Sequence, residues 1–407
     1  MRGDGGIEPG VEFGLGSILW SCAGQGLGAG DGILVPAVAV GGRMREIMRE
    51  AAAPGSEVFL RRIGRFADVQ RSLQALRSRF TGFLRSPSYP HLPQSPRGWE
   101  GQESFRLAAA CDAPDTAGRM LSYRHAFHAG NHADVLKHAV LVFLLDYLNQ
   151  KDKPWWFVDT HAGAAQYALD GEWARKNAEH ESGIERLWSR PGLPPALEAY
   201  LAQVRALNAA QGAGPQLRHY PGSPQLALQC ARPDDRLRLF ELHSTESRVL
   251  QEHFASAGSR VLVKAGDGFA GLASVLPPPT RRALVLIDPS YEDKGDYARV
   301  RATMDDALRR FATGVYLVWY PQVQRREARE LPATLERLAR GAGVDWLHAS
   351  LSVKAPAEGG HGLHGSGVFV FNPPWTLPGM LGEVLPVLKE ALGQDARAAT
   401  QLAHHIA

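Results

Sequence analysis

The segment that most constrains the fold is a run of five apolar residues, Ala283 to Ile287, bounded by an arginine and an aspartate. A short, uninterrupted apolar run is typical of a parallel strand that is buried on both faces. The run ends abruptly in Asp288, Pro289, Ser290 and Tyr291. Ligands of open α/β sheets bind beyond the carboxyl ends of the parallel strands. A carboxylate, stiff backbone carbonyls and a flat ring at such an end predict a site for a planar substrate.

Further apolar segments of strand length alternate with helical patterns along the chain. They predict strands over 155–159, 237–241, 260–264 and 314–321, and a closing hairpin over 344–353 and 367–371. Strands that alternate with helices and end in a hairpin are typical of an α/β fold with a mainly parallel sheet, here with one antiparallel strand. Residues 166–213 have helical patterns instead and predict a helical insertion.

Acidic residues follow the predicted strands at their carboxyl ends. Asp159 precedes a turn of small residues, which lets a backbone loop wrap a nucleotide-like cofactor. Glu241, at the end of the next strand, suits two vicinal ribose hydroxyls, and Asp267 beside Gly268 is placed to receive an adenine amino group. The chain lacks the Gly-Lys-Ser/Thr of a P-loop after these strands, which disfavours ATP as the ligand.

A second segment, Asn372-Pro-Pro-Trp375, has residue types similar to those of Asp288 to Tyr291, which follow the strand over 283–287. It follows the second strand of the predicted hairpin, which should run antiparallel to the others. Its end should therefore lie at the opposite edge of the sheet, as a rigid exit into the last helix. Asp288 is expected on the same side as Asp159, Glu241 and Asp267.

A helix is predicted to begin after Asn131, because Asp134 follows three residues later and an apolar stripe continues to Leu148. His125, His128 and His132 have a spacing that metal ligands can use. No cysteine accompanies them, and clustered histidines before a helix more often make ordinary polar contacts, so we expect no metal. The three cysteines, Cys22, Cys111 and Cys230, are far apart and indicate neither a disulfide framework nor a thiolate zinc site.

Residues 1–119 are rich in Gly, Pro, Ser and Arg and predict a poorly structured extension, so that Met120 is a candidate for the true start. An Arg-rich RNA-binding tail is the other interpretation of this region. No apolar run reaches the roughly 18 residues that span a bilayer, and we expect a cytoplasmic protein. The net charge of +3 is weak, so RNA binding would depend on a local patch, for which Arg124, Lys137 and residues 325–329 are candidates.

The residues after the central strand suit transfer of a methyl group to an exocyclic amino nitrogen. Such a nitrogen is a poor nucleophile because its lone pair is delocalised into the ring; Asp288 and the Pro289 carbonyl would accept its two hydrogens. Tyr291 would stack on the base, a contact worth roughly 1–3 kcal/mol. A methyl sulfonium donor needs alignment and no metal. Adenine is the expected acceptor, and guanine N2, cytosine N4 and a glutamine amide remain alternatives.

Seven motifs together resemble those of one family of enzymes, the RlmJ family of bacterial 23S rRNA adenine-N6 methyltransferases, whose usual target is adenine 2030. The motifs are Met120-Leu-Ser-Tyr-Arg-His125, Phe127-His-Ala-Gly-Asn-His-Ala-Asp-Val-Leu-Lys-His138, Asp159-Thr-His-Ala-Gly163, Tyr220-Pro-Gly-Ser-Pro224, Glu241-Leu-His243, Asp267-Gly-Phe269 and Asp288-Pro-Ser-Tyr-Glu292. The resemblance implies a Rossmann-like class I S-adenosylmethionine-dependent methyltransferase sheet over residues 120–400, with a small helical insertion subdomain. It also implies 23S rRNA as the partner. We expect a monomer that acts on the RNA in a protein-free or early assembly form, because single-stranded or loop RNA avoids most of the cost of flipping a base.

The resemblance also assigns roles to individual residues. It implies that S-adenosylmethionine is bound by His138, His161, Ser223, Glu241, Asp267, Gly268 and Asp288. Asp288 matches the catalytic acid, with Pro289 and Tyr291 beside it, and Tyr123 and Lys137 match residues at the RNA substrate. The family pattern is Asp-Pro-Pro-Tyr, and Ser290 departs from it, which removes one φ restraint. A non-catalytic RNA-binding homologue is the alternative that this departure leaves open.

Overall fold

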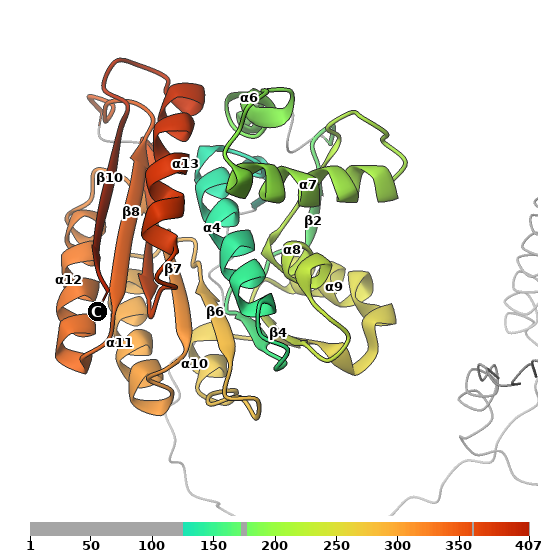
Figure 1. The fold of residues 1–407 in the computed structure, drawn as a ribbon, viewed down its shortest axis with the longest axis vertical. Coiled ribbons are helices and arrows are strands. Elements are labelled where there is room, and N and C mark those ends of the chain that lie inside the picture. The colour runs from blue at the N-terminus through green and yellow to red at the C-terminus, as the bar shows by residue number, and fades with distance from the viewer. Residues whose placement is uncertain (1–124, 172–176, 360–361, 407) are drawn as a thin grey trace, which may run out of the picture. The chain divides into compact units, whose positions relative to one another are not determined.

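An eight-stranded sheet runs through the part of the chain that the structure describes (Figure 1). The structure is a computed structural model and describes residues 125–171, 177–359 and 362–406. The strands lie in the order β10-β8-β9-β7-β6-β1-β4-β5. Their bounds are β1 Trp156–Asp159, β4 Arg236–Glu241, β5 Val261–Ala265, β6 Ala283–Ile287, β7 Val315–Gln322, β8 Trp346–Ser352, β9 Gly365–Phe371 and β10 Ala399–His405; β2 Gln166–Ala168 and β3 His219–Pro221 form a separate pair.

Five neighbouring strands of the sheet, β7, β6, β1, β4 and β5, run parallel to one another. β1 pairs in parallel with β4 and β6, β4 pairs with β5, and β6 pairs with β7. These are the five parallel strands that the apolar runs predict, and the prediction of an α/β fold with a largely parallel sheet is confirmed. The predicted hairpin is also present, because β9 is antiparallel to both β7 and β8.

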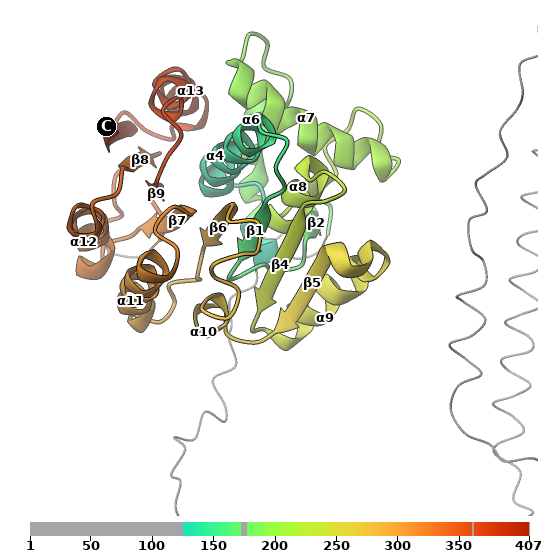
Figure 2. The same cartoon turned by 60° about the horizontal axis from the view of Figure 1, so that its bottom comes forward.

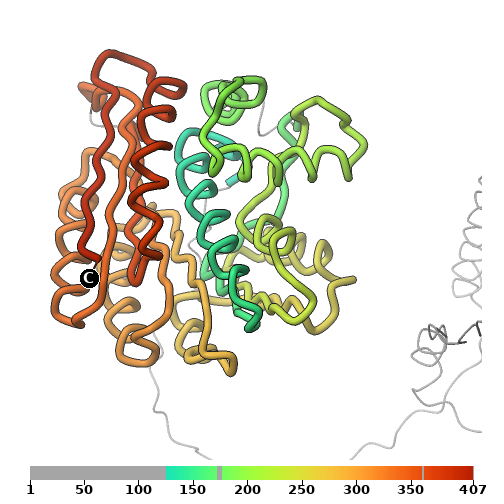
Figure 3. The backbone as a smooth tube through the Cα atoms, viewed as in Figure 1, coloured from blue at the N-terminus to red at the C-terminus, as the bar shows by residue number. Residues whose placement is uncertain are grey.

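The expectation of one antiparallel strand is wrong, because β10 also pairs antiparallel with β8 at the edge of the sheet. The last described residues thus return along this edge (Figure 3). None of the seven residues of β10 is buried. An edge strand without a buried face carries no apolar run, and such runs are the signal by which the other strands are recognised.

Helices cover both faces of the sheet. One face is covered by α4 His132–Asn149, α8 Ser223–Cys230, α9 Ser244–His253 and α13 Leu377–Leu392, and the other by α10 Gly268–Leu272, α11 Gly295–Arg310 and α12 Arg326–Ala342. Figure 2 shows the two layers on either side of the strands. Three short 3₁₀ helices span His125–Phe127, Glu179–Ser182 and Ala255–Arg260. Two cores result, one on each side of the sheet.

β6 contributes to both cores, which explains its uninterrupted apolar sequence. Leu284 and Leu286 face the core under α4, whereas Val285 and Ile287 face the core under α11. All five residues of the strand are at most 2% exposed. Successive side chains of a strand point to opposite faces, so a strand with helices on both sides has no position for a polar side chain before its end. The first polar residue after β6 is Asp288, at the carboxyl edge.

The segment Asn372-Pro-Pro-Trp375 lies at the opposite edge, as its strand direction predicts. Asn372 follows β9, and its side-chain amide donates to the carbonyls of Ala312 and Gly314, just before the start of β7. The carboxyl end of β7 is at the other edge of the sheet. Asn372 therefore closes the turn around the start of a strand.

Residues 166–213 contain β2, α6 Glu185–Trp188 and α7 Pro195–Ala210. α7 packs against α4 and β3, and whether the segment forms a subdomain of its own stays a prediction. The expected extension over residues 1–119, like Tyr123 and Arg124, lies outside the described residues. No helix among those described is long and apolar enough to cross a membrane.

Candidate active site

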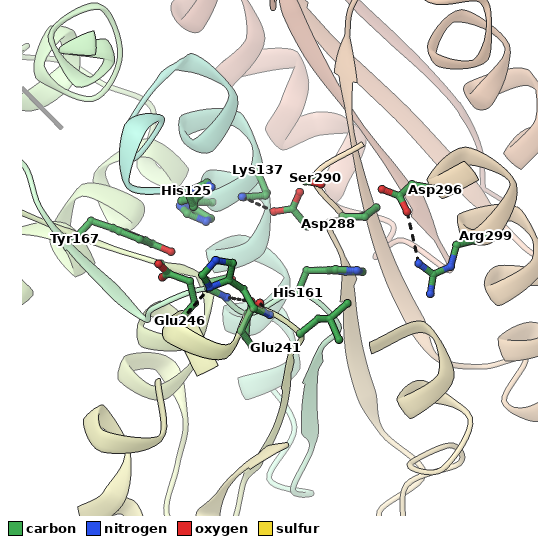
Figure 4. Close-up of a pocket in the computed structure, with 18 residues that line it drawn as sticks. His125, Lys137, His161, Tyr167, Glu241, Glu246, Asp288, Ser290, Asp296 and Arg299 are labelled. Carbon is green, nitrogen blue, oxygen red and sulfur yellow. Dashed lines mark hydrogen bonds and ion pairs between the residues drawn. The ribbon is translucent and has the colours of Figure 1, made fainter. Parts of the chain in front are cut away.

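A pocket opens at the carboxyl edge of the parallel strands (Figure 4). Its wall contains six of the residues predicted to bind cofactor or act in catalysis: His138, His161, Ser223, Glu241, Asp288 and Pro289. They come from α4, from the first turn of α8 and from the ends of β1, β4 and β6. Residues more than 100 positions apart in the chain thus meet in one place, because the carboxyl ends of neighbouring parallel strands share one edge.

A second pocket adjoins the first. Its wall includes Tyr291, Trp319, Arg325 and Leu363, and it shares four residues with the first pocket. The shared residues are His125, Lys137, Asp288 and Ser290. Asp288 therefore borders both pockets, so a group bound in one pocket can reach a group bound in the other at this carboxylate.

Lys137 forms a buried ion pair with Asp288. Its Nζ lies 2.6 Å from Oδ2 of Asp288 and 3.0 Å from Oδ1 of Asp134. The lysine side chain is 5% exposed, and those of Asp134 and Asp288 are 2% and 13% exposed. His125 joins the group through its Nε2, 2.9 Å from Oδ2 of Asp134. Lys137 is thus no part of an exposed basic patch, and its expected contact with RNA stays a prediction.

The charges in this cluster stabilise one another. Burial alone would raise the pKa of the Asp134 carboxyl, yet its contacts with His125 and Lys137 hold that pKa well below its usual range. Burial would likewise lower the pKa of Lys137, and the carboxylates of Asp134 and Asp288 outweigh that effect and raise it. Buried charges are retained only when they are paired in this way. Lys137 therefore stays protonated and holds one oxygen of Asp288 in place.

Glu241 is held at the base of the first pocket by backbone donors. Its Oε2 accepts from the N–H of Gly163 at 2.8 Å, and its Oε1 accepts from the N–H of His243 at 2.7 Å. Burial raises the pKa of this carboxyl, against those two hydrogen bonds. Gly163 has a φ of +63°, and a Cβ there would lie 2.3 Å from the hydroxyl of Tyr167. Only glycine fits this turn beside the carboxylate.

Asp159 and Ser223 form a buried pair behind the pocket. The Ser223 hydroxyl donates to Oδ2 of Asp159 at 2.6 Å, and the N–H of His161 donates to Oδ1 at 3.1 Å. Burial raises the pKa of Asp159 to about 7. Burial also lowers the pKa of His161 to about 3, so its ring is neutral. These bonds fix the turn after β1 and the start of α8 relative to each other.

His138 is a buried residue in the wall of the first pocket. Its Nδ1 lies 2.8 Å from the Tyr220 hydroxyl, whereas its Nε2 is buried without a hydrogen-bond partner among the described residues. Burial holds the pKa of His138 well below its usual range, so the ring is neutral. When Tyr220 donates to Nδ1, the Nε2 carries the proton. The Nε2 lies 3.9 Å from Oδ1 of Asp134, beyond hydrogen-bond distance but close enough for an electrostatic contact.

Asp267 and Gly268 do not line the first pocket themselves, but Asp267 contacts a residue that does. Asp267 accepts from the N–H of Phe269 at 2.9 Å, which caps α10, and it forms an ion pair with Arg299. Arg299 itself lines the pocket. At Gly268 a Cβ would lie 1.9 Å from the carbonyl oxygen of Thr160. Gly268 thus lets α10 approach the end of β1, and the predicted cofactor contacts of both residues stay predictions.

Tyr291 lies in the wall of the second pocket, but most of its ring is covered. The residue is 3% exposed, its hydroxyl donates to the Trp319 carbonyl at 2.7 Å, and its ring packs 4.6 Å from that of Tyr297. Its φ is +55°, a value that non-glycine residues adopt only when their surroundings hold them there. Tyr291 fixes the turn after β6, and its predicted stacking on a base is untested.

The clustered histidines have separate partners. His125 pairs with Asp134, and His128 lies 2.9 Å from Glu179. Asn131 begins α4 as predicted, because its Oδ1 accepts from the N–H groups of Ala133 and Asp134 at 2.9 and 3.0 Å. These contacts hold the start of α4 against the 3₁₀ helix at Glu179 and so position Lys137.

Sequence reasoning missed two features of the site. Lys137 and Asp288 are 151 residues apart, and no local pattern indicates that they pair. Trp319 and Tyr297 both line the second pocket, and the indole Nε1 and the phenol hydroxyl are buried without a hydrogen-bond partner among the described residues. The only local signal for Trp319 is its place near the carboxyl end of the apolar strand β7.

Three comparisons place the chain among known proteins. A family model described as ribosomal RNA large subunit methyltransferase D, RlmJ, matches residues 152–403. The ribosomal RNA large subunit methyltransferases J of Escherichia coli and Haemophilus influenzae are 44% and 42% identical to this chain over 274 residues, which is 67% of this chain and 94% of each relative. A crystal structure of a Legionella pneumophila protein is 34% identical with a TM-score of 0.60, over 68% of this chain and 98% of that one.

Replacing the buried cation tests the cluster directly. We predict that Lys137→Met lowers the free energy of unfolding at pH 7 by about 3 kcal/mol, because it leaves buried carboxylates without their partner. The folded-state pKa of Asp134 is depressed. Its contribution is therefore present above its unfolded pKa of about 4 and is lost as the pH falls through the folded value. The difference between parent and variant should shrink below about pH 4, as measured by urea denaturation.

The matched control is Lys137→Met combined with Asp134→Asn, which removes one of the two stranded charges and should recover part of the lost stability. Lys137→Met as stable as the parent at pH 7 would contradict the account of the ion pair.

Proposed function

We propose that this chain, which belongs to the RlmJ family of ribosomal RNA large subunit methyltransferases, transfers a methyl group from S-adenosylmethionine to N6 of an adenine in 23S rRNA. By its resemblance to the family, the target is adenine 2030. The observation that carries the proposal is the position of Asp288, which borders two adjoining pockets. A donor in one pocket and a base in the other would meet at the carboxylate that accepts hydrogens from an amino group.

The first pocket fits S-adenosylmethionine by the chemistry of its residues. Glu241 presents a carboxylate, held by two backbone N–H groups, that suits vicinal ribose hydroxyls. Gly163 lies in the wall of the pocket, where the backbone of its turn would approach the ligand. His138 lies in the same wall and would contact the bound cofactor. Ser223, His161, Asp267 and Gly268 complete the proposed cofactor site.

When bound, S-adenosylmethionine supplies an electrophilic methyl group on a sulfonium sulfur. The exocyclic nitrogen forms the new N–C bond as the C–S bond breaks, and the amino group loses one proton. Asp288 and the Pro289 carbonyl would accept the two amino hydrogens, which favours a tetrahedral, more nucleophilic nitrogen. The proton then passes to Asp288. No metal takes part in this scheme.

Lys137 acts as a positioning residue in this scheme. It holds Oδ2 of Asp288 at 2.6 Å, and among the described residues no hydrogen bond reaches Oδ1. Oδ1 is therefore available to the amino group. A carboxylate locked in one orientation needs no reorganisation when charge develops on the nitrogen, and such preorganisation is the larger part of electrostatic catalysis.

Adenine is the base that we propose for the second pocket, in preference to guanine. The Nε1 of Trp319 is a donor without a partner among the described residues and lies in the pocket wall. Adenine carries ring nitrogens that accept a hydrogen bond on both sides of its amino group, whereas guanine N2 has an N–H on one side. Ser290 replaces a proline of the family pattern, yet Asp288 and Tyr291 keep their places in the walls of the pockets. This arrangement supports a catalytic protein over a homologue that only binds RNA.

The reaction can be tested with purified protein, labelled donor and a 23S rRNA fragment. We expect nucleoside mass spectrometry to find N6-methyladenine, and Asp288→Asn to lower kcat by about 10²–10⁴ because the amide cannot take up the proton. Asp296→Asn is the matched control, since Asp296 also lines the first pocket but not the second, and it should keep most of the activity. Another methylated product, or an Asp288→Asn variant as active as the parent, would refute the proposal.

The cofactor site can be tested separately by calorimetry with S-adenosylhomocysteine. We predict that Glu241→Gln weakens its binding at least about tenfold, roughly 1.4 kcal/mol. The amide would place an NH₂ against one of the two backbone N–H groups that now donate to the carboxylate. Glu246→Gln, in the same wall, should change the affinity less than threefold by comparison. Equal affinities for Glu241→Gln and the parent would remove Glu241 from the site.

A further inference from the structure

A separate cleft lies between α12 and the sheet. It occupies about 690 Å³, and its walls are α12 on one side and β7, β8, β9 and β10 on the other. None of the predicted cofactor or catalytic residues lines it. Helices normally pack tightly on a sheet, so an opening of this size between α12 and the strands needs an explanation.

The floor of the cleft is aromatic. Trp346 and Phe369 stack with ring centroids 5.7 Å apart, and His348 stacks on Phe369 at 6.2 Å. Tyr320 continues the row, with its hydroxyl 2.8 Å from Nε2 of His348. Burial lowers the pKa of His348 to about 4, so this ring is neutral. The floor is thus rigid, and its four rings are at most 7% exposed, so a ligand in the cleft would contact it through polar edges and not by stacking on open ring faces.

Polar atoms in the cleft lack partners. The Nε1 of Trp346 and the Nδ1 of His364 are buried without a hydrogen bond to any described residue, and Trp346 is 5% exposed. The amides of Gln322 and Gln401 also line the cleft. A buried N–H that is left unpaired costs about 1–3 kcal/mol, so these atoms indicate a ligand that accepts hydrogen bonds at its edge.

The cleft adjoins the second pocket. Val323 belongs to both walls, and the loop after residue 361 contributes Leu363 to the second pocket and His364 to the cleft. Arg329 lies exposed in the wall of the cleft and makes no ion pair within the described part of the chain. A chain with a phosphate backbone that leaves the second pocket would therefore meet the cleft next.

We propose that this cleft binds an unpaired nucleotide of the RNA next to the target adenine. The inference rests on the proposed function, in which the adenine occupies the second pocket. A flipped adenine leaves its neighbours partly unstacked, and a neutral base offers acceptors on its edge to Trp346 and His364. Arg329 would contact the phosphate. Single-stranded RNA is commonly bound by hydrogen bonds to the edges of its unstacked bases and by cations at its phosphates.

The test combines a change in the protein with a change in the RNA. Ala333 is an exposed residue of α12 in the wall of the cleft, so Ala333→Trp fills the cleft without altering the core. We expect this variant to bind a short RNA with the target adenine at least tenfold more weakly by fluorescence anisotropy, with unchanged affinity for S-adenosylhomocysteine. An RNA that lacks the base at one of the two positions next to the target adenine should bind the parent protein as weakly as intact RNA binds Ala333→Trp.

The two changes should not add, because each removes the same contact. Ala302→Trp, an exposed position on α11, is the matched control and should bind intact RNA as the parent does. Additive losses, or an Ala333→Trp variant that binds intact RNA normally, would overturn the proposal. An Ala333→Trp variant that is less stable than the parent but binds RNA equally well would also overturn it, because the cleft would then matter only for packing within the protein. The binding measurements need no turnover, so a product other than N6-methyladenine would refute the proposed function alone.

Discussion

The ion pair between Lys137 and Asp288 is the contact on which the site depends. It joins the first turns of α4 to the end of β6, and both side chains lie in the walls of two pockets. Burying these charges costs free energy, which a second carboxylate, Asp134, and a histidine, His125, help to offset. The start of α4 must therefore stay against the carboxyl edge of the sheet. The contacts of Asn131 and His128 with Glu179 hold it there.

The strand order gives this ion pair its surroundings. β6 lies between β1 and β7, so that the turn after β1, with its fixed Asp159 and Ser223, is on one side and Trp319 is on the other. The first pocket, proposed for the cofactor, lies on the side of β1 and β4, and the second, proposed for the base, lies on the side of β7, as this order requires. The carboxylate between them belongs to both, and transfer between two bound groups requires such a shared border.

Much of this arrangement could be predicted from the sequence, and the missing parts have physical reasons. The apolar runs predict the five parallel strands because a strand buried on both faces admits no polar residue, and the residues after the runs then mark the site. β10 could not be predicted because none of its residues is buried. The partnership of Lys137 with Asp288, the covered ring of Tyr291 and the cleft under α12 arise from packing between distant segments, which no local pattern encodes.

The central claim is that Asp288 receives the amino group of an adenine while Lys137 holds it in place. A crystal structure of the protein with S-adenosylhomocysteine and an RNA fragment that contains the target adenine tests it most directly. The account predicts the adenine in the second pocket, with its N6 within hydrogen-bond distance of Oδ1 of Asp288 and of the Pro289 carbonyl, and Lys137 still on Oδ2. An adenine bound elsewhere, or one whose amino group points away from Asp288, would contradict it.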